Sequence, residues 1–306
     1  LRAVGMQALN VAQSGFVHRH ASRQLNNRRI VTTPSGKAFM SSSNPSAASS
    51  PLAGRTALIT GSTSGIGLGM ALALASQGAR VMLNGFGDVE GALAQVRALD
   101  PLATHHGADM SQPAQIEDMV RTAEQRMGRL DILVNNAGIQ HVANIEDFPV
   151  ERWDAVIAIN LSSAFHAMRV ALPGMKARNW GRVLNIASVH GLVASAGKSA
   201  YVAAKHGIVG LTKTAALECA TTGVTVNAIC PGWVLTPLVQ KQVDARAERD
   251  GVDGAEATRR LVGEKQPAPQ FTTPEQLGAL AVFLCSPAAD NVRGVAWNMD
   301  GGWVAQ

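Results

Sequence analysis

Short apolar segments alternate regularly with longer segments of helical spacing from residue 52 to the end of the chain. The apolar segments are expected to form strands at residues 56–60, 80–83, 103–109, 130–134, 182–187, 224–229 and 295–298. Helical spacing is found between them at residues 67–77, 90–99, 116–127, 153–172, 201–219 and 274–284. Strands that alternate with helices of this length form a parallel sheet with helices on both faces. The sequence therefore predicts an α/β fold with one sheet of about seven strands.

One interval is too long and too charged for a simple connection. Residues 236–270 contain charged helical pieces together with Pro267 and Pro269. Long connections inside a compact domain are often covers of a functional site. We expect a small helical lid over about residues 236–270, within a single domain that spans residues 52–306.

The positive charge of the chain lies at its N-terminal end. Residues 1–50 carry six basic residues and no Asp or Glu, so the whole-chain charge of +5 leaves −1 for the remainder. Such a body lacks the basic surface that nucleic-acid binding needs, and we expect no nucleic-acid partner. Residues 1–51 are predicted to be a disordered leader, because they lack apolar periodicity and include a Ser-rich stretch at 41–50.

The leader allows alternative interpretations. Its Arg-rich, Ser-rich and acid-free composition is typical of a mitochondrial transit peptide, which would place the protein in the mitochondrial matrix. We favour an extension upstream of a start at Met40, with a functional arm as a third alternative. A cytoplasmic location is therefore expected.

Cysteine usage and hydropathy limit the class of protein further. The three cysteines form no CxxC pair and no even-numbered framework, which argues against a disulfide scaffold and a zinc module. No metal site is predicted. The sequence has no run of 18 apolar residues, so we expect no membrane-spanning segment.

A glycine-rich turn follows the first predicted strand. Residues 60–67 read TGSTSGIG and open a predicted helix. Glycines allow a tight turn and close backbone approach, and a helix N-terminus offers free N–H groups and a positive dipole end to a pyrophosphate. The position of the turn between a strand and a helix indicates a dinucleotide site.

A phenol and an ammonium group are expected on one face of a helix. Tyr201 and Lys205 are spaced i and i+4, and Tyr201 is the single tyrosine of the chain. A phenol has a pKa of about 10 and is a poor base at neutral pH, but a nearby ammonium favours the phenolate. Ser188 lies at the end of a predicted strand, thirteen residues before Tyr201.

The ordered set of motifs resembles the classical short-chain dehydrogenase/reductase family. It comprises TGSTSGIG at 60–67, NNAG at 135–138, Asn160, Ser188, Tyr201, Lys205 and the pair Pro231-Gly232. The resemblance covers about residues 52–306. It implies an enzyme with a Rossmann-like doubly wound sheet of seven strands, assembled as a homotetramer.

The resemblance also implies a catalytic set of Asn160, Ser188, Tyr201 and Lys205. Tyr201 would be the general acid/base, and Ser188 would hydrogen-bond the substrate oxygen. Lys205 would bind the nicotinamide ribose and lower the pKa of Tyr201. Asn160 would hold a water molecule in the proton relay.

The cofactor implied by the resemblance is a nicotinamide dinucleotide. Asp109 would meet the adenine and Thr236 the carboxamide. Residues 84–88 carry no acid at the usual NAD-selecting position, but no cation for an NADP phosphate is present there or in residues 61–67. We therefore expect NAD. The implied cofactor-binding residues are Gly61, Thr63, Ser64, Gly65, Ile66, Gly67, Phe86, Asp109, Asn136, Ala137, Gly138, Tyr201, Lys205, Pro231, Gly232, Val234 and Thr236.

Several polar residues near the catalytic set, with the run LNGFGD at 83–88, resemble the bacterial-type D-3-hydroxybutyrate dehydrogenase family. There Gln140, His190, Lys198 and Gln242 would bind the substrate carboxylate. A small anionic hydroxy acid needs a cation and donors in a dry pocket. The expected reaction is (R)-3-hydroxybutyrate + NAD⁺ to acetoacetate + NADH + H⁺. The expected substrate-binding residues are Gln140, Ser188, His190, Lys198, Tyr201, Trp233, Gln242 and Trp303.

Two alternatives remain open on the sequence. The first is another short-chain reductase of the 3-ketoacyl carrier-protein or sugar-alcohol type, which needs no buried cation at Lys198. The second is a non-catalytic nucleotide-sensing scaffold on the same fold, which commonly lacks the tyrosine or the lysine. Individually, Lys198 and His190 could also be a solvated loop charge and a satisfied loop histidine.

Overall fold

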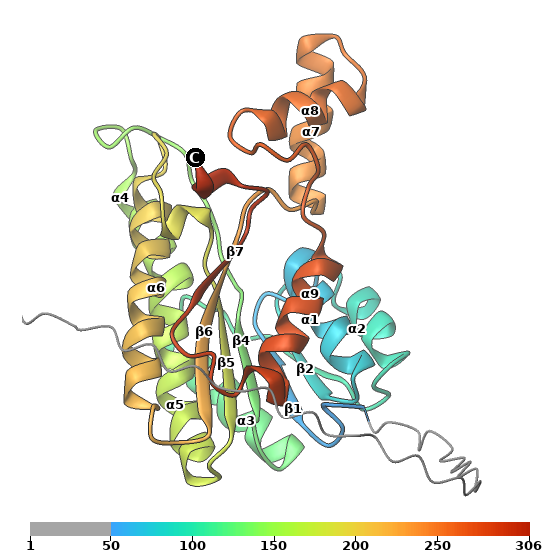
Figure 1. Cartoon of the computed structure of the whole chain (residues 1–306), viewed down its shortest axis with the longest axis vertical. Helices are drawn as coiled ribbons and strands as arrows, with labels where there is room; N and C mark the ends of the chain where they lie inside the picture. The colour runs from blue at the N-terminus through green and yellow to red at the C-terminus, as the bar shows by residue number, and fades with distance from the viewer. Residues whose placement is uncertain (1–49) are drawn as a thin grey trace, which may run out of the picture. The chain divides into compact units, whose positions relative to one another are not determined.

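Seven parallel strands form one sheet at the centre of the computed structural model, which describes residues 50–306 (Figure 1). The strand order is β3-β2-β1-β4-β5-β6-β7. Residues 1–49 of the predicted leader (residues 1–51) lie outside the described residues. The strands are β1 (Thr56–Ile59), β2 (Arg80–Asn84), β3 (Thr104–His106), β4 (Ile132–Asn135), β5 (Gly181–Ile186), β6 (Val224–Pro231) and β7 (Ala296–Met299).

Helices cover both faces of this sheet, as the sequence predicts (Figure 1). The α-helices are α1 (Gly65–Ser76), α2 (Val89–Arg97), α3 (Pro113–Met127), α4 (Val150–Ile157), α5 (Ser163–Ala177), α6 (Ser199–Glu218), α7 (Pro237–Asp250), α8 (Gly254–Gly263) and α9 (Pro274–Cys285). Short helical turns are η1 (Ala158–Ser162), η2 (Val189–Gly191), η3 (Pro287–Ala289) and η4 (Trp303–Ala305). The expected doubly wound α/β architecture is confirmed.

Alternation along the strands produces two core layers. Successive strand residues point to opposite faces, so Ile59 packs with α1, α2 and α9 while its neighbour Leu58 packs with α3, α5 and α6. The connection that follows β1 leads to β2 on one side of the sheet, whereas the connection that follows β4 leads to β5 on the other side. In open sheets of this kind, ligands bind outside the carboxyl ends of the strands at the reversal point.

The predicted helix at 153–172 is longer and is interrupted. It runs from α4 through a π-helical turn, η1, into α5. Length and composition alone would allow the segment Val150–Ala177 to cross a membrane, and 39% of its most apolar window is buried. A search for 18 consecutive apolar residues does not detect this segment, and the expected absence of a membrane-spanning segment stays a prediction. The segment packs beside α3 and α6 in the helical layer, which accounts for part of its apolar character.

The interval predicted as a lid contains the helical hairpin α7–α8, which extends beyond the carboxyl ends of the strands (Figure 1). Val243, Ala257 and Leu261 form its own small apolar cluster, separate from the two clusters on the sheet. The ion pair between Asp250 on α7 and Arg260 on α8 joins the two helices. The hairpin is therefore a compact unit next to the site.

Candidate active site

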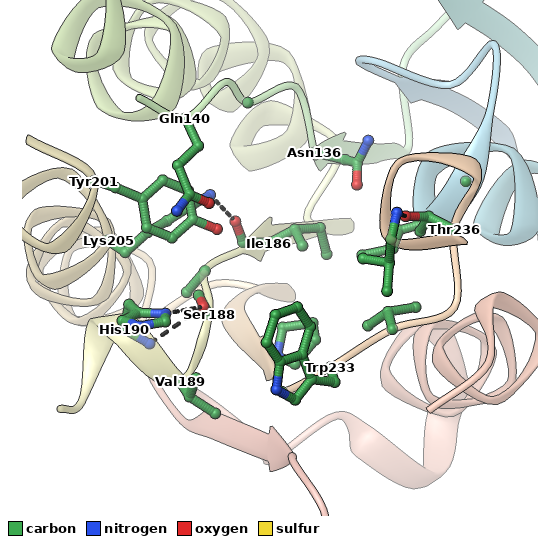
Figure 2. A pocket seen from close by; sticks show the side chains of 18 of the residues that line it. Asn136, Gln140, Ile186, Ser188, Val189, His190, Tyr201, Lys205, Trp233 and Thr236 are labelled. Carbon is green, nitrogen blue, oxygen red and sulfur yellow. Dashed lines mark hydrogen bonds between the residues drawn. The ribbon is translucent and has the colours of Figure 1, made fainter. Parts of the chain in front are cut away.

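A cavity of about 420 Å³ lies at the carboxyl ends of β1, β4, β5 and β6, within the range of small-molecule sites. Figure 2 shows Ser188, His190, Tyr201 and Lys205 together, with Asn136 and Thr236 farther across the cavity. The predicted residues that line it are Gly61, Ser64, Gly65, Ile66, Asn136, Ala137, Gly138, Gln140, Ser188, His190, Lys198, Tyr201, Lys205, Pro231, Gly232, Trp233, Val234, Thr236, Gln242 and Trp303.

The glycine-rich turn needs its glycines for conformation and for space. Gly61 and Gly65 have φ values of 61° and 55°, in the left-handed region. A Cβ atom on Gly61 would lie 2.9 Å from Cα of Ala137. Among the described side chains, none caps the N-terminus of α1, and its first turn carries no charge. Its N–H groups are therefore available to an anionic ligand.

Gly61→Ala should damage the turn, because it adds both backbone strain and a clash with the backbone of Ala137. Strain of this kind costs about 1–3 kcal/mol, so we expect a melting temperature lower by several degrees and weaker dinucleotide binding. Thermal unfolding and a binding titration measure both effects. Gly210→Ala is the matched control, because this α6 glycine has an ordinary φ and open space around it. An unchanged Gly61→Ala protein would contradict the assignment.

The NNAG segment supports this turn from the neighbouring strand. The side-chain amide of Asn136 donates to the carbonyl oxygens of Thr60 (2.9 Å) and Gly61 (2.8 Å). The Thr60 hydroxyl accepts from the backbone N–H groups of Asn136 and Ala137, both at 3.0 Å. These contacts join the ends of β1 and β4, so Asn136 shapes the site as well as lining it.

Ser188, Tyr201 and Lys205 come together because β5 ends beside α6. Ser188 follows β5 and caps η2, where its Oγ accepts from the backbone N–H of His190 at 3.2 Å. Tyr201 and Lys205 lie one turn apart on α6. Nζ of Lys205 donates to the carbonyl oxygen of Ile186 at 2.6 Å and lies 5.6 Å from the centroid of the Tyr201 ring. Two elements thus fix all three groups.

The pKa of Tyr201 differs from the expected lowering. Burial raises this pKa above its ordinary value, and the neighbouring Ser188 hydroxyl acts in the opposite direction. Burial also lowers the pKa of Lys205 to about 8. The ammonium points at the Ile186 carbonyl, and burial of the phenol dominates. In this state the Tyr201 hydroxyl is therefore protonated at neutral pH and can act as an acid.

Asn160 lies behind the cavity and does not line it. Its side chain is buried in the π-helical turn η1. Its Oδ1 accepts from the backbone N–H of Ile139 at 2.8 Å, and its Nδ2 donates to the Ile139 carbonyl at 2.9 Å. The amide thus holds the chain between β4 and α4 in place. A role in a proton relay stays a prediction.

His190 is 5% exposed, and both of its ring nitrogens already have partners. Nε2 lies 2.9 Å from Oγ of Ser195, and Nδ1 lies 3.4 Å from Oγ of Ser188. Burial, reinforced by the nearby Lys198 charge, lowers the pKa of His190 to about 4. The imidazole is neutral at pH 7. His190 lines the cavity, and its contact with the substrate carboxylate stays a prediction.

Lys198 brings a positive charge to the cavity without a partner. Within residues 50–306 its ammonium makes no ion pair or hydrogen bond, and the cavity lining contains no Asp or Glu. Burial lowers the pKa of Lys198, with a smaller contribution from Lys265. The backbone N–H of Ala143 donates to Gly197 O at 3.0 Å, which holds the Lys198 loop near Gln140. The cavity therefore favours an anion.

Two tryptophans form part of the cavity wall. Trp233 and Trp303 have ring centroids 6.4 Å apart. Trp303 is held by the turn η4, in which the Asp300 carboxylate accepts from the backbone N–H groups of Gly302 (3.1 Å) and Val304 (3.0 Å). The wall offers apolar contact to a small carbon chain.

Four predicted cofactor residues lie outside this cavity. Thr63 Oγ1 donates to the Phe86 carbonyl at 2.6 Å, and the Phe86 side chain is 67% exposed. Gly67 packs against Gly61 O, where a Cβ atom would lie only 2.3 Å away. Asp109 Oδ1 accepts from the backbone N–H of Ser111 at 2.8 Å. Their contact with a dinucleotide stays a prediction.

The cavity includes six residues that the sequence did not indicate, namely Ile139, Ile186, Ala187, Val189, Pro237 and Val239. All are apolar and contribute wall or backbone, so no motif identifies them. In the sequence they lie close to Gly138, Ser188 and Thr236, and this nearness was the one indication that they line the site. Over residues 50–306 no group of three or more His, Cys, Asp or Glu is placed to hold a metal ion.

The fold and this cavity define a member of the short-chain dehydrogenase family, and the chain belongs to that family. The family model described as short chain dehydrogenase matches residues 55–247. It therefore covers β1 to α7, including every residue of the predicted catalytic set.

Among its relatives, the chain is 68% identical over 257 residues to the D-beta-hydroxybutyrate dehydrogenase of Cupriavidus necator, a match that covers 83% of this chain and 100% of the relative. The D-beta-hydroxybutyrate dehydrogenase of Rhizobium meliloti is 54% identical, with coverage of 82% and 99%. A solved structure of actinorhodin polyketide ketoreductase with NADPH has a TM-score of 0.76 and 35% identity, with coverage of 81% and 97%.

Proposed function

We propose that this protein oxidises (R)-3-hydroxybutyrate to acetoacetate with NAD⁺ as the hydride acceptor. The observation that carries the proposal is the composition of the cavity. A phenol, a serine hydroxyl and a buried lysine meet there beside the glycine-rich turn, and the unpaired Lys198 faces a lining without carboxylates. The relatives named D-beta-hydroxybutyrate dehydrogenase support this substrate.

The residues of the turn fit a dinucleotide, because Gly61 and Gly65 leave space at the uncapped N-terminus of α1. Bound there, a nicotinamide cofactor would supply the hydride acceptor. The turn would hold its pyrophosphate, and Lys205 and Thr236 would hold its nicotinamide end. Asn136 keeps the turn in shape through its two backbone contacts.

The proton steps follow from the positions of Ser188 and Tyr201. The Ser188 hydroxyl would hydrogen-bond the substrate oxygen and hold it near Tyr201. The Tyr201 phenolate would take the proton of the substrate hydroxyl as the C3–H bond gives up its hydride, so that a ketone forms. In the reverse direction the protonated phenol would donate to the oxygen. Lys205 would stabilise the phenolate as a buried cation.

Substrate selection would depend on the charge of the substrate carboxylate and on the shape of its methyl end. Lys198 would pair with the substrate carboxylate, and the free amides of Gln140 and Gln242 would add hydrogen bonds. Trp233 and Trp303 would pack against the methyl end. Gln242 lies on α7, so closure of the α7–α8 hairpin would complete the carboxylate site and exclude water.

NAD is favoured over NADP by the residues after β2. Asn84 at the end of that strand has its amide committed to the backbone, because Oδ1 accepts from Gly61 N (3.3 Å) and Nδ2 donates to His106 O (3.0 Å) and Ala108 O (2.9 Å). No Lys or Arg lies in residues 61–67 or 84–88 to meet a 2′-phosphate. The ketoreductase solved with NADPH shows that related folds accept the phosphorylated cofactor.

NADH formation tests this proposal. With purified protein, the (R) enantiomer of 3-hydroxybutyrate and NAD⁺ should give a rate far above that with the (S) enantiomer. The rate with NADP⁺ should be lower by at least about tenfold, because a 2′-phosphate without a cation partner is poorly accommodated. Absence of turnover with both enantiomers, together with reduction of a neutral ketone, would instead support another short-chain reductase. Dinucleotide binding without any turnover would support the sensing scaffold.

Assembly and location remain part of the proposal. We propose a homotetramer, supported by apolar side chains that stay exposed along the α4–α5 segment, such as Trp153 and Phe165. We also propose a cytoplasmic enzyme with no nucleic-acid or membrane partner. The bacterial sources of the relatives support the cytoplasmic location and give no support to the mitochondrial alternative.

A further inference from the structure

We propose that His105 is a positioning residue for the cofactor. Its imidazole holds the loop at residues 85–87 in the shape that offers backbone N–H groups to the adenosine ribose, in place of the carboxylate that this chain lacks there. The inference rests on the proposed function in that NAD is the dinucleotide. His105 lies on β3 and belongs to none of the sequence motifs.

The side chains that could replace the missing carboxylate are used elsewhere. An acidic residue about 20 positions after the glycine-rich turn usually binds the ribose 2′-hydroxyl. Asn84 stands near that position, and its amide is bonded to three backbone groups. The nearest acid, Asp88, caps α2 by accepting from the backbone N–H of Gly91 at 2.9 Å. The polar groups that remain for the ribose are therefore those of the loop backbone at residues 85–87.

Two side chains fix the carbonyl groups of this loop. Nε2 of His105 lies 2.9 Å from the carbonyl oxygen of Gly85, and this nitrogen carries the hydrogen because a carbonyl oxygen can only accept. Oγ1 of Thr63 donates to the carbonyl oxygen of Phe86 at 2.6 Å. The loop is thus attached to β3 by one contact and to the glycine-rich turn by the other.

The orientation of these carbonyl groups sets the direction of the N–H groups. In a trans peptide the C=O and the N–H of one unit point in opposite directions, and all the described peptide bonds are trans. The Gly85 carbonyl turns to His105, so the N–H of Phe86 points away from that ring. The N–H of Gly87 likewise points away from Thr63. Among the described contacts neither N–H has a partner, and both residues are exposed. Two donors are therefore available to hydroxyl oxygens.

The two glycines of the loop make the His105 contact important. Gly85 and Gly87 have φ values of 145° and 90°, and glycine adopts many backbone conformations at little cost. Without the His105 hydrogen bond, the first peptide unit of the loop is free to rotate, while the Thr63 contact still holds the second. Binding of the cofactor must then order the loop, and this ordering reduces affinity. The effect is confined to the ribose of the adenosine half.

The test measures dissociation constants for NAD⁺ and for an NAD⁺ analogue whose adenosine ribose lacks both hydroxyl groups. His105→Phe keeps an aromatic ring and removes the donor, so it should weaken NAD⁺ binding by about three- to tenfold, the effect of one hydrogen bond. The dideoxy analogue should bind this variant and the wild type with about equal affinity, because it lacks the groups that the loop receives. His105→Gln places an amide donor near the position of Nε2 and should restore most of the NAD⁺ affinity.

The matched control is His106→Phe, which changes the neighbouring histidine on β3. Successive strand residues point to opposite faces, and Nε2 of His106 lies 3.2 Å from a carboxylate oxygen of Asp118 on α3. This variant should bind NAD⁺ as the wild type does. The kcat of all three variants for 3-hydroxybutyrate should stay near the wild-type value, because the nicotinamide end of the cofactor is unaffected.

Two results would overturn the proposal. One is an unchanged dissociation constant of His105→Phe for NAD⁺. The other is an equal loss of affinity for NAD⁺ and for the dideoxy analogue, which would make His105 a general support of β3. The binding titrations need no turnover. A protein that shows the expected pattern of binding but forms no NADH from 3-hydroxybutyrate would contradict the proposed substrate and leave the role of His105 in place.

Discussion

Tyr201→Phe should lower the rate of NADH formation from (R)-3-hydroxybutyrate by about 10³- to 10⁴-fold, near the upper end of what general acid/base catalysis contributes. The substitution keeps the ring, which packs edge-to-face against His190, and removes the hydroxyl alone. Steady-state kinetics measures the loss. Because the pKa of Tyr201 is raised, its phenolate fraction grows with pH. The wild-type oxidation rate should therefore rise with pH, and the residual rate of the variant should lack this rise.

Dinucleotide affinity provides the control for this variant. Tyr201 and the glycine-rich turn lie on different elements, α6 and α1, so a binding titration should give a dissociation constant close to that of the wild type. A matched melting temperature would show that the fold is intact. A Tyr201→Phe enzyme that keeps most of its activity would falsify the assigned mechanism, whatever its substrate.

Lys198→Ala should lower kcat/KM for 3-hydroxybutyrate by about 10- to 150-fold, the equivalent of one charge-assisted hydrogen bond. The reason is that the cavity lining contains no acidic residue and, besides the buried Lys205, no other lysine or arginine. On 3-hydroxybutyramide, which has the same shape without the charge, the variant should lose little. The ratio of the two substrates therefore isolates the carboxylate contact.

The matched control is Lys213→Ala, which removes an exposed lysine from the same region of the chain, on α6. It should behave as the wild type on both substrates. Equal losses of Lys198→Ala on the acid and the amide would mean that Lys198 supports α6, whose N-terminus it precedes, or the cofactor. No loss on either would make it a solvated loop charge and remove the main support for a hydroxy-acid substrate.

The architecture could be predicted because its strands and helices each have a local pattern of apolar residues in the sequence. Each strand except β3 is within a few residues of its predicted range, and the Gly-rich turn lies between β1 and α1 as expected. The boundaries are less predictable. The strand predicted at 103–109 is only three residues long, because the chain turns away after His106. The π-helical turn at 158–162 interrupts the helix predicted at 153–172, and Asn160 within it bonds to Ile139 in the loop after β4.

The sequence by itself determined which chemical groups reach the site. Order and spacing bring the ends of β1, β4, β5 and β6 to one edge, and the i, i+4 spacing places Tyr201 and Lys205 on one face of α6. These are consequences of backbone periodicity, which is local.

Only the tertiary structure decided what those groups do to one another. Lys205 donates to Ile186, and His190 lies between Ser188 and Ser195. These contacts join separate loops whose approach no local pattern encodes. Burial then raises the pKa of Tyr201 and lowers those of Lys205 and His190, because removing a group from water disfavours its charged form. A side chain's charge state therefore depends on the packing around it, and the packing exists only in the folded chain.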